Sequence, residues 1–510
     1  MSTTTRRMLL LASALLLGLA TVAGPATAAT GFLTANDPYI TLTADAPAGS
    51  TVTAIISGGD QVGDFEFTGL PDGLGHVPGD GTVDVYVAHE ETTVPFFGTA
   101  NFQNASVSRL TLDTTTGAVL SAAVELSPAE GFLRFCSAFM AGPEHGFETY
   151  TFFVNEESND IVEVPAGAVY GADPAFAPDN LRQGGYAIAL RADGSEDFSV
   201  LAGLGRLNHE NTVVVPAWEN KKVILTTDDT FDGPSAQLYM SIANDETRVW
   251  DDKGSLWAFR VTATDAGKVD AGDAFNGAND YLDLQPGEVF QGEFIRVPKQ
   301  IAEGQTGIAP QAALEEWSNA NNVFQFIRLE DLAYDKNDPS VVYIADTGRS
   351  RVVPDPATGR MVRGPGGTVG LADNGSVFVM EFNEKNPHKV DAFYVLAQGD
   401  QPGNDLYVPF VSPDNMDTSP NSLMVQEDAD NARIWHMDLD SGDWTAIATV
   451  NDPDGESSGI LWAADSFGEG AWLLDVQAHG LDPVKEQVID PTLTLVQEDG
   501  QLLIMRIPGS

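Results

Sequence analysis

The sequence predicts an all-β fold, a six-bladed β-propeller, on three observations. Short alternating or β-branched runs recur along the chain in groups of up to four. Acidic residues stand where the first run of a group starts and where the second run ends. Helix signals are scarce, and the best of them is Gln311–Ala320. Imperfect repeats of four short strands separated by polar breaks are typical of propellers, whereas a β-sandwich, the alternative, explains the grouping by four poorly.

The third group is the clearest example of the repeat. Asn208-His209-Glu210 precedes a valine-rich run that ends at Pro216, and Lys222–Thr227 ends at two aspartates. Ala236–Ile242 and Ser255–Val261 complete four short strands. The fourth group, within residues 326–351, has the same plan.

The remaining groups begin near Pro71, Cys136, Pro413 and Glu456, which gives six in all. The sixth supplies three strands, so we expect an N-terminal strand such as Tyr39–Ala44 to complete it. Residues 262–322, between the third and fourth groups, are predicted to be a mostly irregular insertion at the rim, covering one face.

Residues 1–28 are predicted to be an export signal. A pair of arginines, Arg6-Arg7, precedes the apolar run Met8–Leu19, and the small residues Ala26-Thr27-Ala28 follow. Thr5-Arg6-Arg7 fits a twin-arginine signal, and an ordinary secretory signal is the alternative. We therefore expect residues 29–510 to form a single domain that is secreted or lies in the periplasm or outside the cell envelope, without membrane insertion.

The composition excludes several classes of partner. There are 26 Lys and Arg residues against 74 Asp and Glu residues, a formal net charge of -48. Such a chain repels nucleic acid and anionic membranes and attracts cations. Many of these carboxylates are accounted for by solubility alone. Cys136 is the one cysteine, so no intrachain disulfide is expected.

The acids at the ends of the runs are the candidate functional residues. In a propeller the first strand of each blade lines the central channel, so acids at these positions are expected to meet at one end of it. These acids are Glu90, Glu157, Glu210, Asp229, Glu330, Glu427, Asp428 and Glu456. For any one of them a loop cap is the simpler explanation. As a set they would repel one another strongly unless they bound cations such as calcium or a ferric-type ion.

Other residues at the same positions have two interpretations each. Cys136 is either a small buried hydrophobe or a thiolate ligand of a transition metal. Arg328 is either a counter-ion or a clamp for a phosphate or carboxylate. His89, His209 and His479 are expected to orient ligands or to protonate a leaving group. The sequence has no HExxH, GxSxG or Walker-type motif, so a hydrolase of this sequence would use a metal-activated water.

Several motifs resemble one known family. They include GLGRLNHE (Gly203–Glu210), DKGSLWAFRV (Asp252–Val261), FIRLEDLAYD (Phe326–Asp335), NSLMVQED (Asn421–Asp428) and LLDVQAH (Leu473–His479). Together they resemble the PhoX family of secreted alkaline phosphatases over most of the chain. The resemblance implies a six-bladed propeller, a centre of iron and calcium, and hydrolysis of small phosphomonoester substrates by a monomer.

The resemblance also implies site residues. Cys136 matches the iron-binding cysteine, and Arg328 matches the arginine that contacts phosphate. We expect Arg328 and Glu330 to be catalytic. The resemblance implies metal ligands at Cys136, Glu90, Glu157, Glu210, Glu330 and Glu427, and we add Asp428 and Glu456 to the expected ligands because they stand at the same strand ends.

The chain departs from the family pattern in two places. Arg-Leu-Glu replaces Arg-Pro-Glu at Arg328–Glu330, and AGPEHGFETY follows Cys136. The second departure, around Glu144-His145, leaves two alternatives to an alkaline phosphatase. One is a different metal-dependent hydrolase, phytase-like or lactone-cleaving, and the other is a non-catalytic secreted propeller stabilised by calcium.

Overall fold

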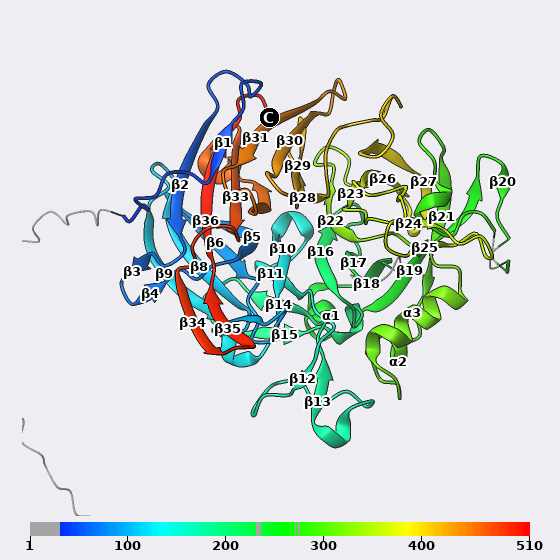
Figure 1. The fold of residues 1–510 in the computed structure, drawn as a ribbon, viewed down its shortest axis with the longest axis horizontal. Helices are drawn as coiled ribbons and strands as arrows, with labels where there is room; N and C mark the ends of the chain where they lie inside the picture. Colours follow the sequence, from blue (N-terminus) through cyan, green and yellow to red (C-terminus); the bar gives the residue numbers. More distant parts are fainter. Residues whose placement is uncertain (1–30, 231–235, 271, 274–275) are drawn as a thin grey trace, which may run out of the picture. The chain divides into compact units, whose positions relative to one another are not determined.

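The computed structural model describes residues 31–230, 236–270, 272–273 and 276–510. The predicted export signal, residues 1–28, lies outside them. The described part from Gly31 to Ser510 forms one compact unit built almost entirely from antiparallel sheets (Figure 1). Among the described residues, no helix is both long enough and apolar enough to cross a membrane.

The first three blades follow the order of the chain. Blade one consists of β5 (Pro71–Pro78), β6 (Thr82–His89), β8 (Ser106–Asp113) and β9 (Val119–Leu126). Blade two consists of β10 (Phe135–Ala141), β11 (Thr151–Glu156), β14 (Ala187–Arg191) and β15 (Phe198–Val200). Blade three consists of β16 (His209–Val215), β17 (Lys222–Asp228), β18 (Leu238–Ala243) and β19 (Ser255–Thr264).

The other three blades repeat this plan. Blade four consists of β22 (Leu329–Tyr334), β23 (Val341–Asp346), β26 (Ser376–Asn383) and β27 (Asn386–Gln398). Blade five consists of β28 (Pro413–Thr418), β29 (Ser422–Glu427), β30 (Arg433–Asp438) and β31 (Trp444–Val450). Blade six consists of β32 (Glu456–Trp462), β33 (Ala471–Ala478), β36 (Asp499–Arg506) and β2 (Thr51–Ser57).

The six inner strands form a closed ring. Each of them contacts the next, in the order β5, β10, β16, β22, β28, β32 and back to β5. Buried apolar side chains from neighbouring blades pack between the sheets, as where Ile56 of blade six and Leu74 of blade one belong to one buried cluster. The predicted six-bladed propeller is confirmed.

The strand that closes blade six differs from the prediction. β2 pairs with β36, so Thr51–Ser57 supplies the fourth strand. Tyr39–Ala44 contains β1 (Ile40–Leu42), which instead pairs with β31 as a fifth strand of blade five. The physical reason is burial: Ile55 and Ile56 are fully buried between blades six and one, whereas Thr41 of β1 is exposed.

The insertion between blades three and four is more regular than predicted. β21 (Phe290–Arg296) pairs with β19 on one side and β27 on the other, so it joins the outer edges of the two blades into one sheet. α3 (Pro310–Ala320) follows, preceded by α2 (Lys299–Ala302), and this helix corresponds to the predicted Gln311–Ala320. The Gln311 side chain accepts a hydrogen bond from the backbone of Asn208, directly before β16.

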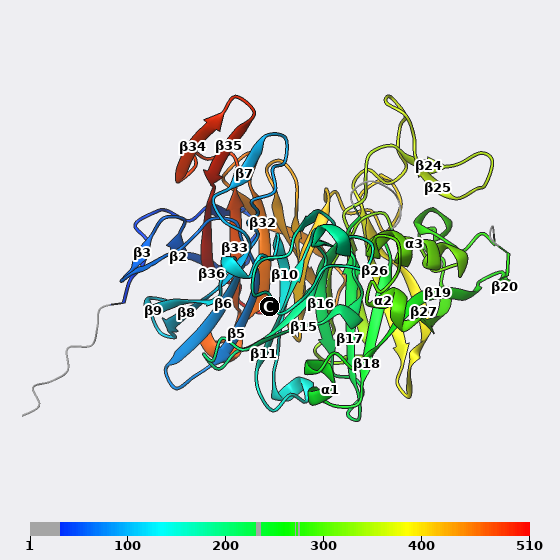
Figure 2. The same cartoon turned by 90° about the horizontal axis from the view of Figure 1, so that it is seen from below.

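Small hairpins and strands extend from one end of the blades. They lie in the connections between second and third strands, and they are β7 (Thr99–Asn101), β12 and β13 (Ile161–Glu163, Leu181–Gln183), β24 and β25 (Val352–Pro354, Met361–Arg363), and β34 and β35 (Lys485–Asp490, Leu493–Gln497). Figure 2 shows β7, β34 and β35 on the same side as β24 and β25. Because second strands end where first strands begin, these segments rise around the entrance to the inner ring.

Closure of blade six by β2 predicts a large cost for truncating Ile56. We expect Ile56→Ala to lower the free energy of unfolding by about 2–5 kcal/mol, because it leaves a cavity between two blades. Val488→Ala is the control, since Val488 is 63% exposed. Urea denaturation of both variants tests this, and an equal, small loss in both would contradict the role of β2.

Candidate metal centre

Each inner strand begins with a β-bulge. At the bulge the inner strand has one more residue than the strand it pairs with. In blade four, for example, Leu329 pairs with Asp346 and Leu332 pairs with Ile344. A bulge re-aims the side chains that it carries. The first bulged residues, from blade one to blade six, are Asp72, Cys136, Glu210, Glu330, Asp414 and Ser458.

A second set of side chains follows the second strand of each blade. In each blade, one second-strand residue pairs with the inner-strand residue just before the bulge, and the set consists of the residue that follows it. These residues are Glu90, Glu157, Asp229, Thr347, Asp428 and Gln477. In an antiparallel pair the end of the second strand lies beside the start of the first. Each blade therefore brings two side chains to the same end of the ring, and most of them are acidic.

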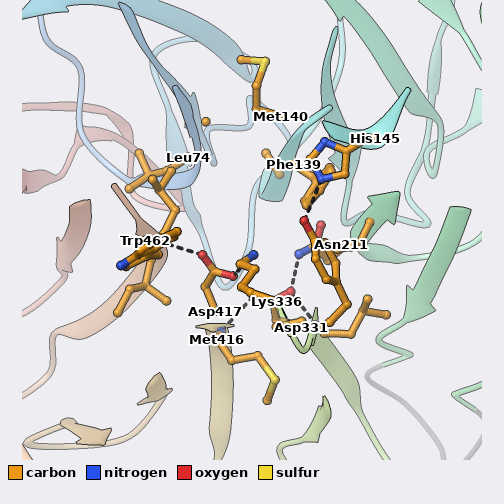
Figure 3. Close-up of a pocket in the computed structure, with 18 of the residues that line it drawn as sticks. Leu74, Phe139, Met140, His145, Asn211, Asp331, Lys336, Met416, Asp417 and Trp462 are labelled. Atoms are coloured by element: carbon orange, nitrogen blue, oxygen red, sulfur yellow. Dashed lines mark hydrogen bonds and ion pairs between the residues drawn. The ribbon is translucent and has the colours of Figure 1, made fainter. Parts of the chain in front are cut away.

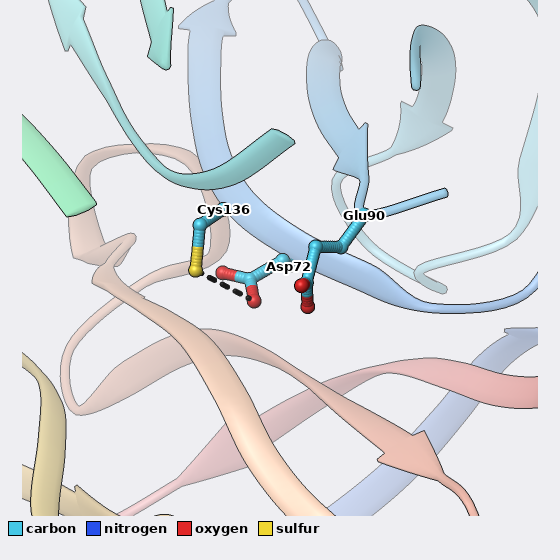
Figure 4. Close-up of side chains that lie close together, drawn as sticks. All are labelled: Asp72, Glu90 and Cys136. Carbon is cyan, nitrogen blue, oxygen red and sulfur yellow. Dashed lines mark hydrogen bonds between the residues drawn. The ribbon is translucent and has the colours of Figure 1, made fainter. Parts of the chain in front are cut away.

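Three overlapping groups of these residues are close enough to share metal ions. They are Asp72, Glu90 and Cys136; Cys136, Glu157 and Glu210; and Glu210, Glu330 and Asp414. In each group, one potential ligand atom per residue lies within 4.8 Å of the others. Because Cys136 and Glu210 each belong to two groups, the seven side chains form a continuous line across blades one to five, here called the acid row. Figure 4 shows the first group.

Burial and mutual repulsion hold the acid row in its protonated form when no cation is present. Burial, with the charges of Glu210 and Glu90 added, raises the pKa of Asp72 well above its usual range. Burial likewise raises the pKa of the Cys136 thiol, and it raises the pKa of Glu210 to about 8. Bound cations would reverse these shifts, because opposite charges favour the ionised form.

Hydrogen bonds satisfy only part of the acid row. Gln477 Nε2 donates to Asp72 Oδ2 at 2.9 Å and to Glu90 Oε2 at 3.0 Å. Ser137 Oγ donates to Glu210 Oε1 at 2.7 Å. Asp72 Oδ1 is buried without a hydrogen-bond partner among the described residues. A buried carboxylate oxygen without a donor is costly, so the donor set fits hard cations on oxygen and a transition metal on the thiol.

Arg328 is held in place beside the row. Its Nε donates to Asp229 Oδ1 at 2.9 Å, and its Nη2 donates to Asp229 Oδ2 at 2.6 Å. The same Nη2 lies 3.3 Å from Glu330 Oε1. Burial lowers the pKa of Arg328, but Asp229 and Glu330 outweigh it and raise this pKa well above its usual value. The guanidinium is therefore charged and its plane is fixed.

The structure does not bring Glu427 into the acid row. Its carboxylate accepts hydrogen bonds from the backbone of Val411 and from Trp435 Nε1, both at 2.9 Å. It also forms an ion pair with Arg433 at 2.8 Å. Successive side chains of a strand point to opposite faces, so it is Asp428, the next residue, that is directed as Glu90 and Glu157 are.

The position of Glu427 has a structural role that recurs. Glu156 and Asp346 stand at the same register position in blades two and four. Glu156 accepts from the backbone of Leu133, and Asp346 accepts from the backbone of Ile327. Each of these acids fixes the loop two residues before its inner strand, which is why their carboxylates are unavailable to the row.

Asp428 and Glu456 extend the site beyond the row. Burial raises the pKa of Glu456 well above its usual range, and Asp428, Asp414 and Glu90 add to this through their charges. Glu456 therefore lies near both ends of the acid row, beside Asp428. Of the predicted ligands, Cys136, Glu90, Glu157, Glu210 and Glu330 are in the row, Asp428 and Glu456 are adjacent to it, and Glu427 is outside it.

Sequence reasoning missed two members of the row as ligands, Asp72 and Asp414. Both follow a proline, in Pro71-Asp72-Gly73 and Pro413-Asp414-Asn415, and such tripeptides are typical of turns. They are the bulge residues equivalent to Glu210 and Glu330. Aligning the first residues of the six repeats on Glu210 and Glu330 would have identified Asp72 and Asp414 as equivalent positions.

Two of the three candidate histidines are turned away from the row. His89 contacts the Gly69 carbonyl and Ser108 Oγ, and His209 contacts Thr226 Oγ1 and the Gly205 carbonyl. Burial lowers the pKa of each to about 4, so both are neutral structural side chains. Burial lowers the pKa of His479, but its pairing with Glu498 at 2.6 Å, with the charges of Glu90 and Asp428, outweighs burial and raises this pKa.

The segment that departs from the family pattern lies far from the row. Glu144 and His145 follow the end of β10, whereas Cys136 stands at its start. At about 3.3 Å per residue, a strand of this length separates them by roughly 20 Å. The altered segment therefore belongs to the opposite end of the ring and gives no reason to expect changed chemistry at the acid row.

Comparison with known families gives one match. The family model described as alkaline phosphatase PhoX matches residues 191–460. This range contains Glu210, Arg328, Glu330 and Asp414. None of the curated proteins matches the chain.

Solved structures support the fold. The structure titled Pseudomonas fluorescens PhoX in complex with vanadate, a transition state analogue, is similar with a TM-score of 0.61 and 16% sequence identity. The match covers 94% of this chain and 97% of that chain. A puromycin hydrolase matches with 13% identity over 84% of this chain and 52% of that chain, and the designed Ika8 protein matches with 8% identity over 86% and 97%. Their TM-scores of 0.32 and 0.30 are too low to indicate a shared fold.

The raised pKa values predict how pH affects the protein without metal. Burial raises the pKa of Glu210 from 4.5 to about 8. Between these values the folded chain binds more protons than the unfolded chain, so stability falls as pH rises. We expect the Tm of chelator-treated protein to fall from about pH 5 to about pH 8. Added calcium and iron should remove this dependence, and a Tm that rises with pH in the chelated protein would contradict the assignment.

Proposed function

The chain belongs to the PhoX alkaline phosphatase family, whose model covers 270 of its 510 residues (191–460), and we propose that it is an exported, metal-dependent phosphatase that hydrolyses phosphomonoesters at the acid row. The observation that carries the proposal is that Arg328, a cation held in place by Asp229, lies beside a row of mostly buried potential ligands. Phosphoryl transfer depends mainly on positioning and on stabilisation of charge, which such a site supplies.

The acid row would hold calcium and iron. Oxygen ligands from Asp72, Glu90, Glu330 and Asp414 suit calcium, and the thiolate of Cys136 suits iron. When bound, these ions would act as Lewis acids on the phosphoryl group and lower the pKa of an attacking water. The fit rests on the unpartnered Asp72 oxygen and on the raised pKa of Asp72, because burial and neighbouring charges disfavour its ionised form and bound cations would offset this.

Cations are also needed for the substrate to approach. A chain with a formal net charge of -48 repels phosphate esters, and any ionised member of the acid row adds to that repulsion. Once the row is neutralised, Arg328 provides a planar donor group suited to phosphate oxygens. Asp229 holds the plane of that group, so Arg328 would orient the phosphate and Asp229 would position Arg328.

The surroundings favour small substrates. Figure 2 shows β7, β24–β25 and β34–β35 rising on one side of the blades, and β12–β13 occupies the equivalent connection of blade two, after the end of the second strand. They restrict access to the row from the side. Export fits the predicted signal in residues 1–28 and the family, and it would place the enzyme where free phosphate esters are encountered.

Glu330→Gln tests the role of the row. The change keeps the shape of the side chain and removes a charged ligand, so we expect kcat/KM for a chromogenic phosphomonoester to fall by about 100-fold or more at alkaline pH. Glu427→Gln is the matched control. It should retain activity within about threefold while losing roughly 1.5–3 kcal/mol of stability from the bond to Arg433. Equal loss of activity in both variants would contradict the placement of Glu427.

Elemental analysis of native protein separates this proposal from a non-catalytic propeller. We expect both calcium and iron in wild type, and Cys136→Ser should lose iron while keeping calcium, because only the soft ligand is removed. Protein that carries calcium but no iron would favour a secreted propeller stabilised by calcium alone.

A further inference from the structure

A cavity lies on the inner ring, away from the acid row. Its volume is about 520 Å³, within the range of about 300–1,000 Å³ that is usual for small-molecule sites. None of the seven acid-row residues lines it. Every inner strand contributes a residue to its wall beyond the bulge: Leu74, Ala138, Val213, Leu332, Met416 and Ile460.

The interior of the cavity is largely apolar and aromatic. Phe139 and Met140 of β10 are only partly buried and face it, and Leu461 and Trp462 contribute from β32. Figure 3 shows Phe139 and His145 on one side with Leu74 and Trp462 on the other. Partly exposed apolar side chains gathered in one concave site favour an apolar ligand body.

The polar groups inside the cavity already satisfy one another. Lys336 Nζ binds Asp417 Oδ1 at 3.0 Å and lies 4.3 Å from the Tyr334 ring centroid. Asp417 Oδ2 accepts from the backbone of Trp462 at 2.8 Å. Asp331 accepts hydrogen bonds from Asn211 Nδ2 and from the backbone of Met416. The pair Lys336–Asp417 is therefore neutral as a unit, and burial, which raises the pKa of Asp331 to about 7, favours its neutral form.

Two carboxylates at the rim of the cavity remain exposed. Glu144, in the segment that departs from the family pattern, has a side chain 58% exposed, and Asp465 has one 55% exposed. Asp465 accepts from His76 Nε2 at 2.8 Å, if this nitrogen carries the proton. Glu144 lies 3.2 Å from His145 Nδ1, but that nitrogen accepts a hydrogen bond from the backbone of Gly142.

The two rim carboxylates therefore carry more negative charge than the histidines beside them offset. Burial lowers the pKa of His145, so this ring is neutral and does not cancel the charge of Glu144, whose own pKa is lowered because the contact with His145 outweighs burial. The charge of Asp465 acts on Glu144 across the rim. Two like charges over an apolar cavity would be relieved by a ligand cation at the rim.

We propose that this cavity binds a small organic ammonium ion, with the cation between Glu144 and Asp465 and an apolar or aromatic body inside. A carboxylate ligand is disfavoured, because Lys336 is already paired with Asp417 and the rim is acidic. A neutral ligand would gain binding free energy only from contact with the apolar walls. The inference stands on the cavity and the charges at its rim, and it does not depend on phosphatase activity.

Calorimetric titration of metal-replete wild type with phenethylammonium tests the proposal. At roughly 0.15 M salt, where weak surface attraction is screened, we expect saturable binding. Binding of 2-phenylethanol should be at least about tenfold weaker, and 3-phenylpropionate weaker still, since both lack the cation. Tighter binding of 3-phenylpropionate would assign the anchor to Lys336 and overturn the proposal, as would equal binding of the alcohol or no saturable binding of phenethylammonium.

Variants distinguish the cavity from general attraction to an acidic protein. The double change Glu144→Gln with Asp465→Asn should weaken binding about tenfold or more, whereas Glu148→Gln, an exposed acid of the same segment that does not line the cavity, should leave it unchanged. Met140→Trp fills the cavity and should abolish binding while thermal melts report an intact fold. Unchanged binding in the double variant, or an equal effect of Glu148→Gln, would refute the site.

Discussion

Mutual repulsion among buried acids at one end of the strand ring is the constraint on which the rest of the structure depends. Six bulges direct Asp72, Cys136, Glu210, Glu330 and their equivalents to a common end, and burial raises their pKa values. The ring cannot open to separate them, because the blades are closed by β2 and packed against one another. Bound cations would relieve this repulsion and favour the ionised form of the row.

Adjacent positions on the second strand divide structural and chemical tasks. Glu156, Asp346 and Glu427 hold the loop before the inner strand. The residue after each of them points the other way, and in blades two and five it is an acid, Glu157 or Asp428. Because the period of a strand is two, a shift of one residue would exchange the two tasks. This explains why dense acidic pairs recur at these ends without all being ligands.

Sequence reasoning captured what repetition and alternation control. The six units, the candidate helix and most of the acid row follow from local pattern, because each blade repeats the same short strands and polar breaks. It failed where the outcome depends on packing between blades or on the register of a strand. The closing strand is Thr51–Ser57 because of packing between blades, Asp72 and Asp414 resemble turn residues, and Glu427 is distinguished from Asp428 only by the register of β29.

The two ends of the ring are joined by a thin polar layer, which sets how they can influence each other. Ser137 Oγ donates to Glu210 and accepts from Asn415 Nδ2 at 2.6 Å, and Asp331 links Asn211 to the backbone of Met416. Asn211, Asp331 and Met416 also line the cavity at the far end. Asp331 therefore borders both ends of the ring: it lines the cavity, and its charge adds to burial in raising the pKa of Glu210 in the acid row.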